Sequence, residues 1–131
     1  MDILLDTHVL IWYTEGDEAL STNAVSIIEN PNNNVYISVI SFFEIAIKIK
    51  IGKLVLCKSF DDLFKQTSKA KINTIPVTQY DLSQYLDIPL HPQHKDPFDR
   101  LIIATAITRG LSIISVDKNF SIYNDFLDII I

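Results

Sequence analysis

The chain has 131 residues, of which 48% are hydrophobic and 21% are charged, and its 16 acidic and 11 basic side chains give a formal net charge of −5. This length and composition predict one domain over residues 1–131 that needs no disulfide or structural metal, and they exclude a disordered chain. The net acidity counts against a nucleic-acid partner, because phosphate binding favours a basic surface.

The charges are unevenly distributed along the chain. Residues 1–44 hold seven acids and no lysine or arginine, whereas residues 45–71 hold seven lysines and two aspartates. The single cysteine, Cys57, cannot form an internal disulfide, and the N-terminus lacks the basic residues of a secretory signal. No apolar run reaches the ~18 residues of a membrane span. We therefore expect a cytoplasmic protein.

Short apolar runs alternate with longer segments of helical period. Such runs are typical of strands buried on both faces of a parallel sheet, so the pattern predicts an α/β fold. The expected strands, in chain order, are 3–5, 35–37, 72–77, 113–116 and 129–131, and the expected helices between them are 21–30, 59–70, 79–87 and 97–109.

One segment fits both kinds of element. Isoleucines occupy every second position of residues 45–51, which by period alone favours a strand. However, Ser41 and Glu44 have the spacing of a capping box that opens a helix, and Gly52 can close one. We predict a helix here, with Glu44 in its first turn.

Five acids fall where the expected strands end. In an open parallel sheet, ligands bind outside the carboxyl ends of the strands, so acids at these ends are candidate site residues. They are Asp6 after the first strand, Glu44 after the second, Asp96 and Asp99 at the start of helix 97–109, and Asp117 after the fourth strand.

Each acid also has a structural explanation. Glu44 can complete the capping box, and Asp96 and Asp117 can cap the elements that follow them. Asp99 is favoured by the dipole of its own helix. Asp6 is harder to explain in this way, because a charge directly after three apolar residues is costly unless it is paired.

Together, the acids favour a metal site. Carboxylates brought together without a nearby lysine or arginine repel one another unless a cation holds them. A site rich in oxygen and free of thiolates suits Mg²⁺ or Mn²⁺ better than Zn²⁺. The usual work of such a cation is phosphate chemistry.

Other kinds of site find less support. His8, His91 and His94 lack the spacing of a zinc motif. We expect His91 and His94 to be ordinary surface residues in a loop, whereas His8 either lies at the rim of the acidic site or packs at the start of a helix. The chain has no recognisable serine or cysteine nucleophile motif and no glycine-rich phosphate loop.

Four motifs, taken in order, resemble those of the PIN-domain ribonucleases, specifically the VapC-type toxins of bacterial toxin–antitoxin pairs. The resemblance extends from Ile3 to Phe120, which is nearly the whole chain. The motifs are LLDTHVLIW at 4–12, SFFEIAIK at 41–48 with GKL at 52–54, HKDPFDRLIIA at 94–104, and SVDKNF at 115–120.

The resemblance implies a PIN-like three-layer α/β/α sandwich with a five-stranded parallel sheet and a metal site at the strand ends. Thr7 and Ser115 match hydroxyls that support the first and last acids, and Asp96 matches an additional acid of the DPFDR motif. His8 stands where many PIN domains have Asn. Four carboxylates match the catalytic, metal-holding positions: Asp6, Glu44, Asp99 and Asp117.

The predicted function is therefore that of an endoribonuclease that depends on Mg²⁺ or Mn²⁺. By resemblance, its products carry 5′-phosphate and 3′-hydroxyl ends, and its partners are an RNA substrate, a cognate antitoxin and a second copy in a homodimer. Lys48, Lys50 and Lys53 are weak candidates for contacts to the RNA backbone, since a solvated helix face explains them almost as well.

Two other classes of function remain open. A phosphoacceptor receiver or an aspartyl phosphatase also places acids at strand ends, but the phosphatase motif needs a second Asp where this chain has His8. A non-catalytic RNA- or protein-binding module on the same fold is the other alternative, and the four intact acids count against it. Setting those four aside leaves 12 acids against 11 bases, so the excess acidity lies mostly in the proposed site.

Overall fold

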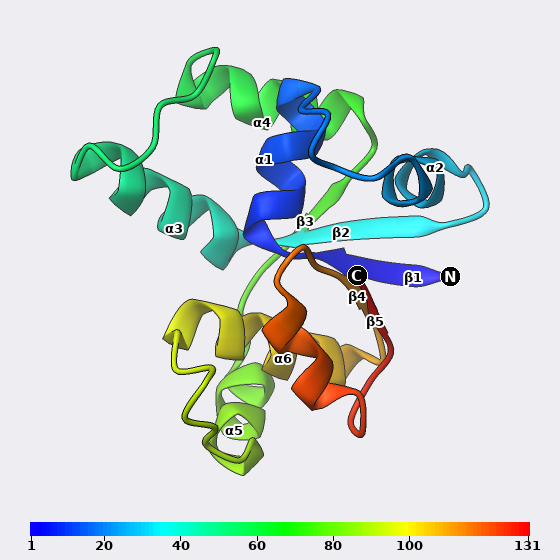
Figure 1. Cartoon of the computed structure of the whole chain (residues 1–131), viewed down its shortest axis with the longest axis vertical. Coiled ribbons are helices and arrows are strands. Elements are labelled where there is room, and N and C mark those ends of the chain that lie inside the picture. The colour runs from blue at the N-terminus through cyan, green and yellow to red at the C-terminus, as the bar shows by residue number, and fades with distance from the viewer.

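A five-stranded parallel sheet forms the centre of the molecule, as Figure 1 shows for the computed structural model, which describes all residues from 1 to 131. The spatial order of the strands is β3-β2-β1-β4-β5, and every pair is parallel. The predicted fold class is thereby confirmed. The strands are β1 (Asp2–Leu5), β2 (Asn34–Ser38), β3 (Asn73–Ile75), β4 (Ser112–Ile114) and β5 (Ile129–Ile130).

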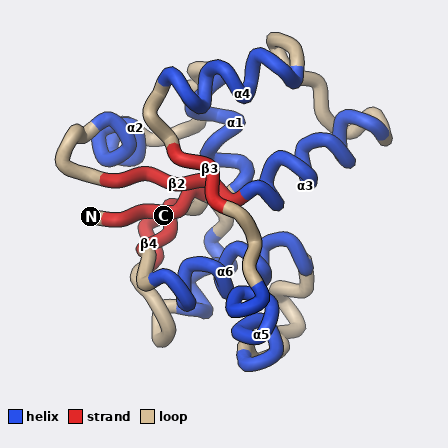
Figure 2. Tube along the Cα trace, turned by 180° about the vertical axis from the view of Figure 1, so that it is seen from behind, coloured by secondary structure: helices blue, strands red, loops and turns tan.

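Helices cover both faces of this sheet. In Figure 2, α1, α2, α3 and α4 lie on one side of the sheet and α5 and α6 on the other. None of these helices is both long enough and apolar enough to cross a membrane. Their bounds are α1 (Thr7–Glu15), α2 (Thr22–Glu29), α3 (Val39–Lys50), α4 (Phe60–Lys69), α5 (Gln79–Asp87) and α6 (Pro97–Arg109), and a 3₁₀ helix, η1, covers Lys118–Tyr123.

The two faces of the sheet carry separate hydrophobic clusters. Ile3 and Leu5 of β1 belong to the cluster under α1 to α4, and Leu4, between them, belongs to the cluster under α5 and α6. Successive side chains of a strand point to opposite faces, so the continuous apolar runs supply both clusters at once. All three of these side chains are fully buried.

The ambiguous segment is a helix, as predicted, but it begins three residues earlier than expected. Ser38 caps α3 by accepting a hydrogen bond from the backbone N–H of Ile40. Ser41 therefore lies inside the helix, and the predicted capping box between Ser41 and Glu44 is wrong. Glu44 consequently lies in the second turn of α3, and this rotates its side chain toward α1.

Candidate metal centre

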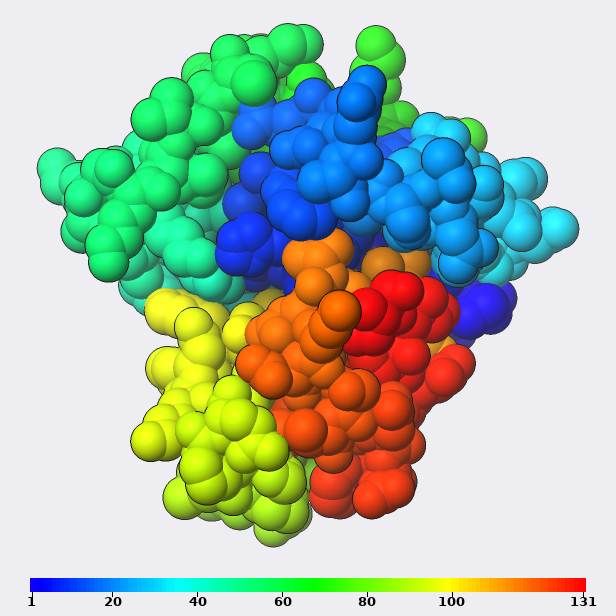
Figure 3. All heavy atoms as spheres, in the orientation of Figure 1, coloured from blue at the N-terminus to red at the C-terminus, as the bar shows by residue number.

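All five acids predicted at the strand ends line one cleft. The cleft lies where β1 leads into α1, β4 leads into η1, and the first half of α3 approaches the start of α6. Figure 3 shows these four segments meeting on the face toward the viewer. The residues around the cleft are Asp6, His8, Glu44, Lys48, Asp96, Asp99, Val116, Asp117 and Phe120.

Asp6 is held rigidly at the end of β1. It is the N-cap of α1, and its Oδ1 accepts a hydrogen bond of 3.0 Å from the Val9 backbone N–H. Its Oδ2 accepts a hydrogen bond from the Ser115 hydroxyl, which comes from the end of β4. Burial raises the pKa of Asp6 above its ordinary value of 3.8, and these hydrogen bonds offset the shift only in part.

Glu44 reaches the cleft from α3 and is also buried. Its Oε1 accepts a hydrogen bond of 2.8 Å from the Thr7 hydroxyl, whose oxygen also lies 2.9 Å from the Ser41 hydroxyl. Its Oε2 pairs with Lys48 Nζ one helical turn later, at 3.0 Å. Thr7 thus orients Glu44, while Ser115 orients Asp6.

Asp96 and Asp99 enter the cleft from the start of α6. Asp96 is the N-cap of this helix and accepts hydrogen bonds from the backbone N–H groups of Phe98 and Asp99, at 2.8 and 3.2 Å. Asp99 follows in the first turn. Burial foremost, together with the neighbouring carboxylates of Asp96 and Glu44, raises its pKa from 3.8 to about 8.

Asp117 completes the acidic cluster at the end of β4. It caps η1 by accepting a hydrogen bond of 2.9 Å from the Asn119 backbone N–H, as its position in the sequence suggested. Its own backbone N–H donates to the Ser115 hydroxyl at 3.0 Å. Ser115 therefore ties the first and last acids of the cluster together.

The prediction that His94 is an ordinary surface residue is wrong. His94 is 4% exposed, and its ring packs between Phe120 and Tyr123 with centroids 5.1 and 5.3 Å away. Its Nε2 lies 3.4 Å from Asp99 Oδ2 and 3.9 Å from Asp117 Oδ2. Burial lowers the pKa of His94 below 6.5. Its place two residues before Asp96, the first residue of the DPFDR motif, was the available signal.

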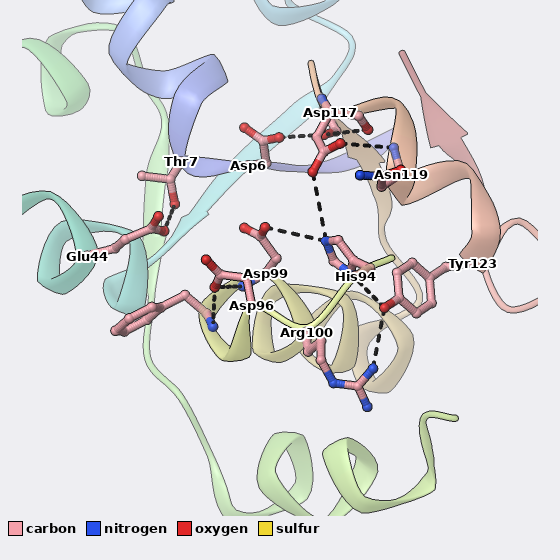
Figure 4. Close-up of polar contacts among 12 residues, drawn as sticks. Asp6, Thr7, Glu44, His94, Asp96, Asp99, Arg100, Asp117, Asn119 and Tyr123 are labelled. Carbon is pink, nitrogen blue, oxygen red and sulfur yellow. Dashed lines mark hydrogen bonds and ion pairs between the residues drawn. The ribbon is translucent and has the colours of Figure 1, made fainter. Parts of the chain in front are cut away.

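The residues present fit a divalent cation. Figure 4 shows Asp6, Glu44, Asp99 and Asp117 around a common space. Oxygen atoms of Glu44, Asp96 and Asp99 all lie within 4.8 Å of one another. Carboxylate oxygens without a thiolate are the ligands that Mg²⁺ and Mn²⁺ prefer, and the raised pKa of Asp99 reports the repulsion that such a cation would relieve.

We expect this repulsion to make the stability of the cation-free protein fall with rising pH. Asp99 binds its proton up to a pKa of about 8 when folded but only up to about 3.8 when unfolded, so the folded chain holds more protons between these values. The free energy of unfolding should therefore decrease as the pH rises from about 4 to about 8. Urea denaturation in EDTA at several pH values measures this.

Asp99→Asn is the matched control for that measurement, because it removes the titrating group and should flatten the pH dependence. Saturating Mg²⁺ should also flatten it. A free energy of unfolding that rises with pH over this range in the wild-type protein would contradict the prediction.

The three candidate lysines lie differently from one another. Lys48 is half-buried, lines the cleft and pairs with Glu44. Lys50 and Lys53 are exposed beyond it, at the end of α3 and in the following turn. The Lys48 ammonium group is therefore paired with the Glu44 carboxylate, whereas Lys50 and Lys53 are available to contact a polyanion.

Comparison with known proteins matches residues 3–125 to the PIN domain family model. Ribonuclease VapC22 of Mycobacterium tuberculosis is 28% identical over 116 residues, which cover 88% of this chain and 87% of that protein. Solved structures that are 16–20% identical to this chain show the likeness of its fold.

Three solved structures illustrate this likeness. VapBC2 from Rickettsia felis, bound to a DNA fragment from its promoter, has a TM-score of 0.70 at 16% identity and covers 98% of this chain and 97% of its own. FitAcB from Neisseria gonorrhoeae has a TM-score of 0.64 at 20% identity, with 98% and 96% covered. The sarcin–ricin loop cleaving toxin VapC20 of Mycobacterium tuberculosis has a TM-score of 0.61 at 16% identity, with 96% and 97% covered.

Proposed function

Because the chain belongs to the PIN-domain family, we propose that it is an endoribonuclease that hydrolyses RNA phosphodiester bonds with a divalent cation, Mg²⁺ or Mn²⁺. The observation that carries this proposal is the convergence of acids from four separate segments in one cleft, with Asp6 and Glu44 buried there. The relatives named Ribonuclease VapC22 and sarcin–ricin loop cleaving toxin support RNA as the substrate.

In this proposal, Asp6, Glu44, Asp99 and Asp117 hold the cation. When bound, it supplies positive charge for the phosphate oxygens and lowers the pKa of the attacking water. Ser115 and Thr7 fix the orientations of the Asp6 and Glu44 carboxylates by their hydrogen bonds. Lys48 lowers the net negative charge of the cleft at the Glu44 side. The resulting RNA ends would be 5′-phosphate and 3′-hydroxyl.

Chelation tests the cation requirement. We expect the purified protein to cleave RNA in the presence of Mg²⁺ or Mn²⁺, to lose this activity in EDTA, and to regain it when excess Mg²⁺ is added, because the clustered carboxylates cannot serve an anionic substrate without a cation. Denaturing gels of labelled RNA give the rates.

Cleavage that survives EDTA would contradict the proposal. If calorimetry also shows no binding of Mg²⁺ or Mn²⁺, the non-catalytic binding module becomes the better explanation. Thermal unfolding in EDTA is the control that separates loss of the cation from loss of the fold.

Lys50 and Lys53 could bind phosphates of the RNA backbone beside the cleft. They are exposed, and they follow α3 away from Glu44 and Lys48. Both belong to residues 45–71, which hold seven lysines and two aspartates. RNA binding through so few exposed lysines would be weak and would decrease with salt.

We further propose that the chain is the toxin of a toxin–antitoxin pair. Its structural neighbours include VapBC-5 of Mycobacterium tuberculosis, a member of a family of toxin–antitoxin systems, and the DNA-bound complexes VapBC2 and FitAB. Expression of the wild-type chain in a bacterial host should arrest growth, and a small protein encoded beside its gene should relieve the arrest. The homodimer stays a prediction.

Expression of Asp99→Asn at the same level is the control for this arrest. Growth that continues with the wild-type chain, although the purified protein cleaves RNA, would leave a ribonuclease without a toxin role. Arrest by both chains would show a cause other than cleavage.

A further inference from the structure

A buried chain of polar groups leads from Arg100 to the acids. Arg100 Nη1 donates to the hydroxyl of Tyr123 at 3.4 Å, and this hydroxyl lies 2.7 Å from His94 Nδ1. Arg100, Tyr123 and His94 are 1%, 0% and 4% exposed. Figure 4 shows His94 between the Tyr123 hydroxyl on one side and the carboxylates of Asp99 and Asp117 on the other.

The hydrogen bonds at one end of this chain fix the proton of the imidazole. A guanidinium can only donate, so the Tyr123 oxygen is an acceptor toward Arg100. The only other polar atom that the Tyr123 hydroxyl contacts is His94 Nδ1. A buried hydroxyl that did not donate there would leave its proton without an acceptor, which costs about 1–3 kcal/mol. Nδ1 is therefore the acceptor, and the proton of a neutral His94 lies on Nε2.

The surroundings of Nε2 agree with this assignment. Nε2 is buried and has no hydrogen-bond partner, and the polar atoms nearest to it are Asp99 Oδ2 at 3.4 Å and Asp117 Oδ2 at 3.9 Å. With a cation bound, both carboxylates are ionised, and ionised carboxylates only accept hydrogen bonds. A lone pair on Nε2 would face their lone pairs, whereas an N–H would be attracted to both.

We propose that His94 is a positioning residue, in which the Nε2–H group faces the carboxylates of Asp99 and Asp117 and, by attracting both, holds them for cation binding. The inference depends on the proposed function in one respect only, namely that these two acids hold the cation. In this proposal His94 is not itself a ligand of the cation, although its ring nitrogen lies within 4.8 Å of the Asp99 and Asp117 oxygens. Tyr123 and Arg100 act through it by keeping the proton on Nε2.

The tautomer is tested by nuclear magnetic resonance on the ¹⁵N-labelled full chain with Mg²⁺, without RNA. Long-range ¹H–¹⁵N correlations should show His94 with a protonated Nε2 and an unprotonated Nδ1. In Tyr123→Phe, which removes the hydroxyl donor, this preference should weaken. A protonated Nδ1 in the wild-type protein, or evidence that Nε2 is itself a ligand of Mg²⁺ or Mn²⁺, would overturn the proposal.

Two variants separate positioning from packing. In His94→Gln the amide nitrogen reaches about as far as Nε2 and keeps a donor there, whereas in His94→Asn the amide reaches only as far as Nδ1. Loss of such an orienting partner typically lowers metal affinity 10–100-fold. By calorimetry with Mg²⁺ alone, we expect His94→Asn to lose affinity in about this range and His94→Gln to stay within about threefold of the wild type.

Equal Mg²⁺ affinities for His94→Asn and the wild type, with both folded by circular dichroism, would overturn the proposal. Equal losses in both variants would do so too, because they would show that shape rather than the donor matters. If His94→Asn does not fold, the wild-type tautomer and His94→Gln still decide the matter. If these results hold and the chain does not cleave RNA, the proposed function fails while this inference stands.

Discussion

Asp6→Asn is expected to reduce the rate of RNA cleavage by about 10³-fold or more. A metal-held charge contributes several kcal/mol to the transition state of such a reaction, and each 1.36 kcal/mol corresponds to a factor of ten. The amide has the shape of the carboxyl group, its oxygen can accept from the Val9 N–H, and its nitrogen can donate to the Ser115 hydroxyl oxygen, but it has no charge. Cleavage of a labelled RNA at saturating Mg²⁺ measures the loss.

The fold should survive this substitution. Burial raises the pKa of Asp6, which means that its charge is destabilising in the cation-free protein. Asp6→Asn should therefore unfold at an equal or higher urea concentration in EDTA. Loss of activity together with retained stability assigns Asp6 to the chemistry rather than to the core.

Asp2→Asn is the matched control. Asp2 begins the strand that Asp6 follows, but it is exposed, and its carboxylate accepts a hydrogen bond from the Asn34 side chain, away from the cleft. We expect this variant to cleave at the wild-type rate. If Asp6→Asn keeps more than about a tenth of the activity, the assignment of Asp6 as a cation ligand is wrong.

The sheet was predictable because its strands are buried on both faces. In a run such as Ile3 to Leu5, successive apolar side chains point to opposite faces of the sheet, so all of them are buried only when helices cover both faces. Runs of this kind identified all five strands. The strand ends were less predictable. The expected strand 72–77 is paired only over Asn73–Ile75, and it is followed by Pro76, which has no N–H to donate to a neighbouring strand.

The acids were predictable because a general rule places ligands at the carboxyl ends of parallel strands. Their hydrogen-bond partners were not predictable by that rule. Ser115 and Asp6 lie 109 residues apart, and Thr7 and Glu44 lie 37 apart, so neither contact leaves a local pattern. The same holds for His94, whose loop suggests exposure until Phe120 and Tyr123 fold over it.

Arg100→Met is expected to destabilise the chain by about 3 kcal/mol or more, although Arg100 belongs to the same motif as Asp99. Arg100 is 1% exposed, and it donates to the backbone carbonyls of Ile88 and Pro89 at 3.0 Å each and to the Tyr123 hydroxyl. Each buried acceptor left without a donor costs about 1–3 kcal/mol. Thermal unfolding should shift down by roughly 10 °C.

Arg109→Met in the same helix is the matched control for this large effect. Arg109 also donates to a carbonyl, that of Pro76 at 2.7 Å, and lies 3.7 Å from the Asp81 carboxylate, but its side chain is 30% exposed and Asp81 keeps its hydrogen bonds from Thr78 and Thr108. We expect its loss to cost about 1 kcal/mol or less. Equal destabilisation by the two substitutions would show that the buried contacts of Arg100 do not hold the 88–89 segment to α6. A much larger loss of stability for Arg100→Met would show that the DPFDR motif has two roles. Its acids face the cleft, and its arginine holds residues 88–89 against α6 by hydrogen bonds.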